Sequence, residues 1–246
     1  MDIKDILTKD EYTKEQSVNG LFEFFKQKNR ELSQWSPKCS DAKTRGDIRY
    51  RVLDKGLPYK FAHELTPFAH YANTYYSNKP KVKFKPCCGS EQHDGIIIDN
   101  NKKNFVEITD AKEGWKWGLQ KELLIKNGHA PWEHNVHGVE GNKTKQNRTA
   151  NDIITSNELI RHKALICNAK KLVKEKTTDK CKKSLGPKLP YKEGKTILIV
   201  TFDDTGFSEN DRGDFVNFKK AEIDSTKHKF MKIVLFGWVS KKFINT

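Results

Sequence analysis

Three segments with short apolar runs most constrain what this chain can fold into. TILIVTF (196–202) is almost entirely apolar, and KIVLFGWVS (232–240) is nearly so. Runs of this length and composition are typical of strands that are buried on both faces. HDGIIIDNNKKNFVEITDAK (93–112) holds two more apolar runs joined by an Asn-rich turn, which predicts a hairpin. The chain must therefore build a central sheet and cover both of its faces.

Helical patterns between these segments supply the covering layers. We expect helices over residues 10–32, 58–77 with a break or restart at Pro67, 111–126 and 151–176. KVKFKPCC (81–88) alternates lysine with apolar residues, which is the period of a half-exposed strand. This order predicts one α/β domain over residues 1–246, with a mixed central sheet flanked by helices. Its core would span about 58–126 and 195–240, with a basic helical insertion at about 129–194.

The positive charge of the chain is concentrated in one segment. The net charge is +14, and residues 141–195 carry 15 basic and 5 acidic side chains. Such a concentration suits a phosphate backbone, because each neutralised phosphate releases counterions. A lysine-rich solubilising surface is the alternative. We expect this segment to bind DNA, with RNA as the open alternative, through Lys143, Lys145, Arg148, Arg161, Lys163, Lys170 and Lys171.

The N-terminal sequence, the apolar stretches and the cysteines indicate the cellular compartment that we expect for the protein. The opening MDIKDILTKDEY has no apolar core of a signal peptide, and no stretch approaches the roughly 20 apolar residues that span a bilayer. The five cysteines form no CxxC pair, and their odd number fits a reducing compartment. We therefore expect a cytoplasmic protein without a membrane partner.

Three features outside the hairpin are weaker candidates for chemistry. Cys87, Cys88 and His93 could begin a zinc site, but further ligands at recognisable spacing are missing. Asp203 and Asp204 follow a predicted strand and either add acids near the end of the sheet or begin a turn. The histidines of the predicted loop over 129–147 match neither HNH-type nor zinc spacing well: His129, His134 and His137.

The hairpin carries one acid on each of its strands. Side chains alternate across a strand, so parity decides which residues share a face. If the turn closes with Asp99 opposite Asn104, then Asp94 lies opposite Thr109, and Glu107 shares their face. A shift of one residue would separate the two acids. Acids in central strands are costly unless they are paired or bind metal, so the pattern predicts a Mg²⁺ site, with Mn²⁺ as an alternative.

The same stretch resembles the PD-(D/E)XK nuclease superfamily. His-Asp-Gly (93–95) stands for the acid that opens one strand, and Glu107-Ile108-Thr109 stands for the acid, any residue and lysine of the next. The resemblance covers about residues 58–126 and implies a restriction endonuclease-like fold. It also implies a Mg²⁺-dependent endonuclease that cleaves DNA, with Asp94 and Glu107 as metal ligands and Glu64 from the preceding helix as a third. Sequence-specific restriction enzymes are often dimers, so the resemblance leaves a homodimer open.

Thr109 departs from the family pattern, in which a lysine helps to position and activate the attacking water. A displaced lysine could replace it, with Lys112, Lys121 or Lys85 as candidates. Alternatively, the hydroxyl of Thr109 could itself orient the water. If neither holds, the chain is a catalytically silent nucleic-acid-binding module on the same fold. A basic protein-interaction domain is the remaining class of function.

Overall fold

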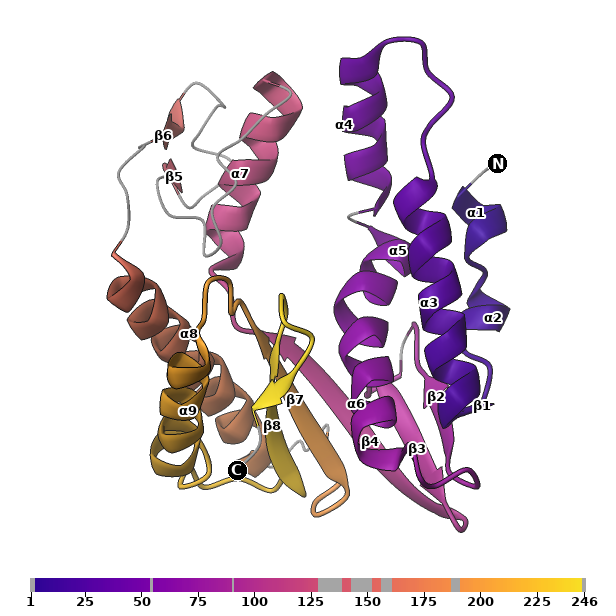
Figure 1. Ribbon diagram of the computed structural model, residues 1–246, viewed down its shortest axis with the longest axis vertical. Coiled ribbons are helices and arrows are strands. Elements are labelled where there is room, and N and C mark those ends of the chain that lie inside the picture. Colours follow the sequence, from indigo (N-terminus) through magenta and orange to yellow (C-terminus); the bar gives the residue numbers. More distant parts are fainter. Residues whose placement is uncertain are drawn as a thin grey trace.

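A seven-stranded mixed sheet lies between two helical layers in a computed structural model of the chain (Figure 1). The structure describes residues 3–53, 55–89, 91–127, 139–142, 152–155, 161–186 and 191–244. The predicted mixed α/β architecture is therefore confirmed. Among the described residues, no helix is both long and apolar enough to cross a membrane.

The helices and strands have the following bounds. The α-helices are α1 (Ile3–Ile6), α2 (Lys9–Tyr12), α3 (Val18–Gln34), α4 (Ala42–Leu53), α5 (Gly56–Lys60), α6 (Thr66–Tyr76), α7 (Gly114–Asn127), α8 (His162–Leu185) and α9 (Glu209–Phe218). Two π-helical turns are η1 (Phe61–Leu65) and η5 (Lys219–Ile223). The strands are β1 (Gln16–Ser17), β2 (Lys83–Pro86), β3 (Gly95–Asp99), β4 (Lys102–Asp110), β5 (Val139–Glu140), β6 (Ile154–Thr155), β7 (Thr196–Phe202), β8 (Lys232–Gly237) and β9 (Phe243–Ile244).

The main sheet has the strand order β1-β2-β3-β4-β7-β8-β9. Strands β1 to β4 form antiparallel pairs, whereas β4, β7 and β8 run parallel and β9 returns antiparallel to β8. Strands β5 and β6 form a separate two-stranded sheet. The long strand β4 therefore joins the antiparallel half of the main sheet to its parallel half.

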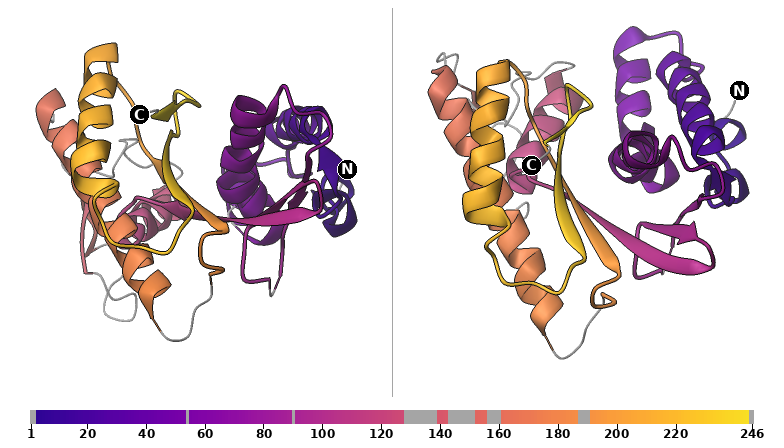
Figure 2. Two further views of the ribbon diagram at one scale, coloured as in Figure 1. Left: turned by 90° about the horizontal axis from the view of Figure 1, so that it is seen from below. Right: turned by 60° about the horizontal axis from the view of Figure 1, so that its bottom comes forward.

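The central strand β7 shows why its sequence is apolar. Ile197 and Ile199 belong to the core formed with α3 and α6, while Leu198 and Val200 belong to the core formed with α8 and α9. All four side chains are 0% exposed. The two helical layers cover opposite faces of the sheet (Figure 2). Each such burial contributes about 1.5 to 3 kcal/mol, so an unbroken apolar run is what a strand in this position requires.

The N-terminal helical region differs in detail from the prediction. The expected helix over 10–32 is divided into α2 and α3, with β1 between them. The hydroxyl of Ser17 accepts a hydrogen bond from the N–H of Gly20 at 3.2 Å and so begins α3. The expected break at Pro67 is confirmed as a change of helix type, because the π-turn η1 passes into α6 at Thr66. Proline has no N–H to continue the preceding hydrogen-bond pattern.

The basic helix also differs from the prediction. Instead of residues 151–176, α8 spans His162–Leu185. Its side chains Ile166, Leu172 and Val173 are buried in the core shared with β7. The helix is thus a layer of the fold and not an insertion beside it. Ile154, which lies inside the range expected for this helix, is instead 66% exposed in β6.

Candidate functional site

The turn between β3 and β4 is two residues shorter than expected. Asp99 pairs with Lys102, and the turn consists of Asn100 and Asn101, with φ of 47° and 65°. Two consecutive residues with positive φ form the tight turn that suits a twisted hairpin, and asparagine tolerates this conformation. The predicted pairing of Asp99 with Asn104 is therefore wrong. The shift is even, however, so the alternation of faces is the predicted one for the paired residues Gly95–Asp99.

The regular ladder of β3 and β4 ends just after Asp94. Gly95 pairs with Val106, and the N–H of Asp94 also donates to the carbonyl of Val106 at 2.9 Å, so two residues lie opposite one residue of β4, as in a β-bulge. Asp94 is near Glu107, whose pKa its charge raises, but the two acids are not a pair of the ladder. Thr109 is two residues further along β4 and remains on the face of Glu107.

Asp94 is held in place by the backbone of β4. Its Oδ2 accepts a hydrogen bond from the N–H of Ile108 at 2.7 Å. The carboxylate thus occupies the place that a strand carbonyl would take if β3 began earlier. Gly95 follows for a steric reason, because a Cβ at this position would lie 2.7 Å from the buried ring of Phe68. Both residues of the Asp-Gly pair therefore have a structural role, because Asp94 binds the N–H of Ile108 and Gly95 leaves room for Phe68.

Glu107 is only 9% exposed and forms an ion pair with a lysine that the sequence did not single out. Its Oε1 contacts the ammonium group of Lys180, which comes from α8. The hydroxyl of Tyr191 donates to the same oxygen at 3.3 Å, and the Nζ of Lys180 lies 3.5 Å from that hydroxyl. Three groups from three distant segments thus meet on the α8 face of β4.

The acids in this region raise one another's pKa values. Burial raises the pKa of Asp94 to about 6, and the negative charge of Glu64 adds to this, although the hydrogen bond from Ile108 opposes it. Burial also raises the pKa of Glu107, and the charge of Asp94 adds to it, while Lys180 opposes both effects. The raised pKa values mean that the negative charge of these carboxylates is only partly compensated by their surroundings. A bound cation would supply the missing positive charge.

Glu64 lies near this pair but has a partner of its own. Its carboxylate contacts the Nζ of Lys60 at 2.8 and 3.2 Å, within the junction of α5 and η1. Burial raises the pKa of Glu64, Lys60 opposes the rise, and the charge of Glu107 adds a smaller increase. Among the described residues, no group of three His, Cys, Asp or Glu side chains is arranged to hold a metal ion. Asp94 and Glu107 are thus two candidate donors, a number that suffices for Mg²⁺ with its retained waters.

The three lysines that we considered as replacements lie elsewhere. Lys112 forms an ion pair with Asp110 at 2.6 Å and so does not reach the acid pair. Lys85 lies in β2 opposite Ile96, and β3 separates it from β4. Lys121 belongs to α7. Among the described residues, the lysine in contact with Glu107 is Lys180.

A second polar cluster follows at the end of β4 and was not predicted. The Nδ1 of His63 lies 3.0 Å from Oδ2 of Asp110, the oxygen that Lys112 also contacts. The ring of His63 stacks between Tyr59 and Trp238, with centroid distances of 4.3 and 5.6 Å. Burial alone would raise the pKa of Asp110, but the hydrogen bond from His63 and the charge of Lys112 hold it below its usual value.

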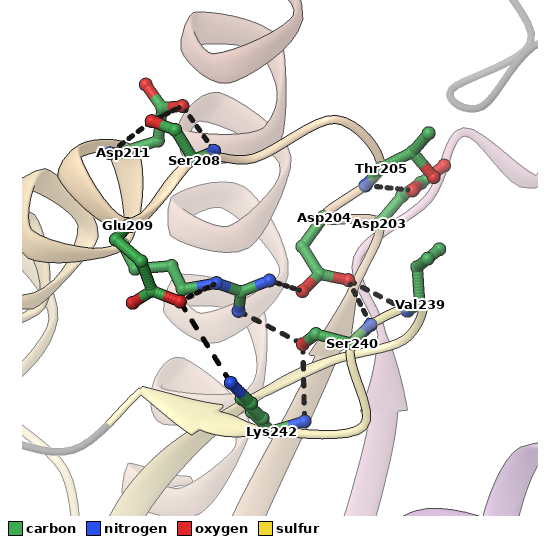
Figure 3. Close-up of polar contacts among 10 residues, drawn as sticks. Asp203, Asp204, Thr205, Ser208, Glu209, Asp211, Val239, Ser240 and Lys242 are labelled. Atoms are coloured by element: carbon green, nitrogen blue, oxygen red, sulfur yellow. Dashed lines mark hydrogen bonds and ion pairs between the residues drawn. The ribbon is translucent and has the colours of Figure 1, made fainter.

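Asp203 and Asp204 have structural roles (Figure 3). The side chain of Asp204 is 0% exposed; it accepts a hydrogen bond from the N–H of Val239 at 2.8 Å and forms an ion pair with Arg212 at 3.0 Å. It thereby ties the end of β7 to the segment that follows β8. The carboxylate of Asp203 accepts a hydrogen bond from the N–H of Thr205 at 2.9 Å and begins a turn.

The residues that we expected to contact nucleic acid are only partly placed. Three of them lie outside the described residues: Lys143, Lys145 and Arg148. Three are exposed on or beside α8: Arg161, Lys163 and Lys171. Lys170 forms an ion pair with Asp214 and lies over the ring of Phe215, so its charge is already partnered. The exposed charge on α8 is therefore smaller than its sequence suggested.

The described residues give no support to the two other metal sites considered from the sequence. Cys87 and Cys88 are buried, and His93 packs on the ring of Phe105 with a centroid distance of 4.3 Å. No metal group includes them in the described part of the chain. The loop histidines lie outside that part: His129, His134 and His137.

Comparisons of the chain with protein-family models, with curated proteins and with solved structures find no match.

Proposed function

We propose that the protein is a Mg²⁺-dependent nuclease that hydrolyses phosphodiester bonds in DNA, with a restriction endonuclease-like site. The observation that carries this proposal is the proximity of Asp94 and Glu107, where the charge of Asp94 raises the pKa of Glu107, with Lys180 in contact with Glu107. The resemblance of the hairpin to the PD-(D/E)XK pattern supports the same reading. The proposal concerns the acid pair, Lys180 and the residues that hold them.

The acid pair fits a hard divalent cation. Both candidate ligands are carboxylates, and burial raises the pKa of each; the charge of Glu64 adds to the rise at Asp94, and the charge of Asp94 adds to the rise at Glu107. When bound, Mg²⁺ would lower the pKa of a water molecule and neutralise charge that develops on the phosphate. Mn²⁺ has similar ligand preferences and serves as an alternative cofactor.

Lys180 provides the positive charge that Thr109 cannot provide. Burial alone would lower the pKa of Lys180, but the charge of Glu107 and its hydrogen bond hold it above the usual value. The ammonium group therefore stays protonated and acts as a hydrogen-bond donor, not as a base. Beside Glu107, it can orient the attacking water or bind a phosphate oxygen. Tyr191 holds the carboxylate of Glu107 in position through its hydroxyl.

Glu107 is also suited to accept a proton. A carboxylate with a raised pKa is a better base than an exposed one, which helps it to take a proton from the attacking water. Asp94 is less free to do so, because one of its oxygens is occupied by the N–H of Ile108. Exposed basic residues of α8, among them Lys163 and Lys171, support a nucleic-acid substrate.

One observation favours a second candidate, a catalytically silent nucleic-acid-binding module. Lys180 already compensates the charge of Glu107, and a stable ion pair can take the place of a cation. In that case the acid pair would only stabilise the fold.

Incubation of the protein with supercoiled plasmid in Mg²⁺, Mn²⁺ or EDTA separates the two candidates. The nuclease cuts with metal, and the cutting is lost in Asp94→Asn and Glu107→Gln. Asp99→Asn, at the other end of β3, is the matched control and should remain active. Salt-sensitive binding without cutting would instead support the module, and absence of both binding and cutting would contradict both candidates.

A further inference from the structure

A pocket of about 450 Å³ opens at the beginning of β8. Strand β9 pairs only with Leu235 and Phe236, so in the described structure the first half of β8 has no strand on that side. The pocket occupies this place and is bounded by α6, η5 and the segment before β8. Its lining residues are Tyr75, Lys219, Asp224, His228, Met231, Lys232, Ile233, Val234 and Ile244. None of them belongs to the acid pair, so this is a separate feature of the fold.

The pocket contains two ammonium groups and one carboxylate. Lys219 has a side chain only 7% exposed and contacts both oxygens of Asp224, at 2.8 and 2.9 Å. Lys232 instead lies over the rings of Tyr71 and Tyr75, at 5.0 and 4.6 Å from their centroids. Ring faces stabilise a cation but do not neutralise it. Among the described residues no acid forms an ion pair with Lys232, so one positive charge in the pocket is not neutralised by them.

The electrostatics of Lys232 agree with this geometry. Burial lowers its pKa, and the positive charge of Lys219 lowers it further. A half-buried ammonium group in a positive field gains most from a bound anion. The lysine side chain is also held by the two tyrosine rings, so little flexibility is lost when a ligand binds.

His228 adds a second, independent indication. Its Nδ1 is buried, and among the described residues it has no hydrogen-bond partner. An unsatisfied buried polar atom is unfavourable by about 1 to 3 kcal/mol, so such atoms usually have a partner in the functional state. Because His228 lines the pocket, a ligand there can supply that partner.

We propose that this pocket binds a small phosphate-bearing ligand, with the phosphate group between Lys219 and Lys232 and within reach of His228. An ammonium group is a compact point charge that suits a multiply charged phosphate, whereas planar carboxylates are better matched by the fork of arginine. Tyr75 and Met231 provide an apolar wall for the organic part of a phosphate monoester. The volume falls within the range of pockets that take small molecules. This inference does not depend on the nuclease proposal.

Isothermal titration calorimetry at constant ionic strength tests the pocket. The probes are inorganic phosphate and adenosine 5′-monophosphate, and acetate serves as the anion that lacks a phosphate group. We expect saturable binding of a phosphate probe and not of acetate. Lys232→Met keeps the apolar stem on the tyrosine rings and should weaken binding about tenfold or more. The matched control is Lys220→Met, an exposed neighbour on η5 that does not line the pocket, and it should bind as the wild type does.

A second measurement uses the unaltered protein, in case Lys232→Met folds poorly. In NMR spectra, the imidazole signals of His228 and the amide of Ile233 should shift as phosphate is added. The proposal is overturned if neither probe binds saturably, if acetate binds as well as phosphate, or if both lysine variants lose binding equally. It is also overturned if phosphate binds without affecting the signals of His228 and Ile233.

Discussion

Lys180 of α8 forms an ion pair with Glu107 of β4, although 73 positions separate the two residues in the chain. The contact joins the helical layer to the strand that carries Glu107. It places an ammonium group beside Glu107, which lies two residues before Thr109 on β4. Both the stability of the fold and the proposed chemistry depend on this pair.

Removal of either partner should destabilise the protein more than removal of both. Lys180→Met leaves the largely buried carboxylate of Glu107 without compensation, whereas adding Glu107→Gln removes that charge as well. We expect a coupling free energy of about 1 to 3 kcal/mol from the two single variants and the double variant in urea unfolding. Strictly additive effects would show that the ion pair does not form.

Asp94→Asn should stabilise the protein at alkaline pH. The pKa of Asp94 is raised to about 6, so its contribution to stability is full below the unfolded value of about 3.8 and is lost as the pH rises through 6. At pH 8 the variant should be more stable than the wild type by about 1 to 2 kcal/mol, because the carboxylate is only partly buried. Urea unfolding at pH 4 and pH 8 measures this, and a difference that does not change with pH would contradict it.

Asp110→Asn should show the opposite pH dependence. The pKa of Asp110 is held low by His63 and Lys112, so the carboxylate stabilises the fold above its unfolded pKa and loses this effect as the pH falls. We expect the variant to be less stable by about 2 kcal/mol at pH 7, with the gap narrowing below pH 4. Thermal unfolding of both proteins across this pH range measures the difference in stability. If this difference widens on acidification, His63 and Lys112 do not hold the pKa of Asp110 low.

Gly95→Ala should destabilise the hairpin by steric means. The new Cβ would lie 2.7 Å from the ring of Phe68, which is 0% exposed and has little room to move. We expect a loss of about 1 to 3 kcal/mol. Gly114→Ala in α7 is the matched control, since nothing lies within 4 Å of its added Cβ and alanine favours helices. Equal stability of the two variants would refute the close contact.

The sheet was predictable because it rests on local patterns, and the apolar runs of β7 and β8 indicated their positions directly. The register of the hairpin was not predictable: the four residues NNKK fit turns of different length, and only backbone geometry distinguishes them. Strand parity did not fix the position of Asp94, because parity holds only within a regular ladder, and the ladder is interrupted where Asp94 and Gly95 both face Val106.

The partners of the acids were not predictable, because they come from distant segments. Lys180 belongs to a helix whose limits were misjudged: the apolar residues of 151–160 continue its spacing, although α8 begins only at His162. His63 follows an apolar aromatic pattern, and nothing local indicates that it meets Asp110. Such contacts depend on how helices pack over the sheet, and no single period in the sequence encodes that.

The central claim is that Asp94 and Glu107 together hold one divalent cation. Titration with Mn²⁺, followed by the loss of the electron paramagnetic resonance signal of the free ion, measures this without any nucleic acid. We predict one Mn²⁺ bound per chain by the wild type and by Asp99→Asn, and binding weakened about tenfold or more in Asp94→Asn and in Glu107→Gln. Failure of the wild type to bind, or equally tight binding by the Asp94→Asn Glu107→Gln double variant, would contradict the claim.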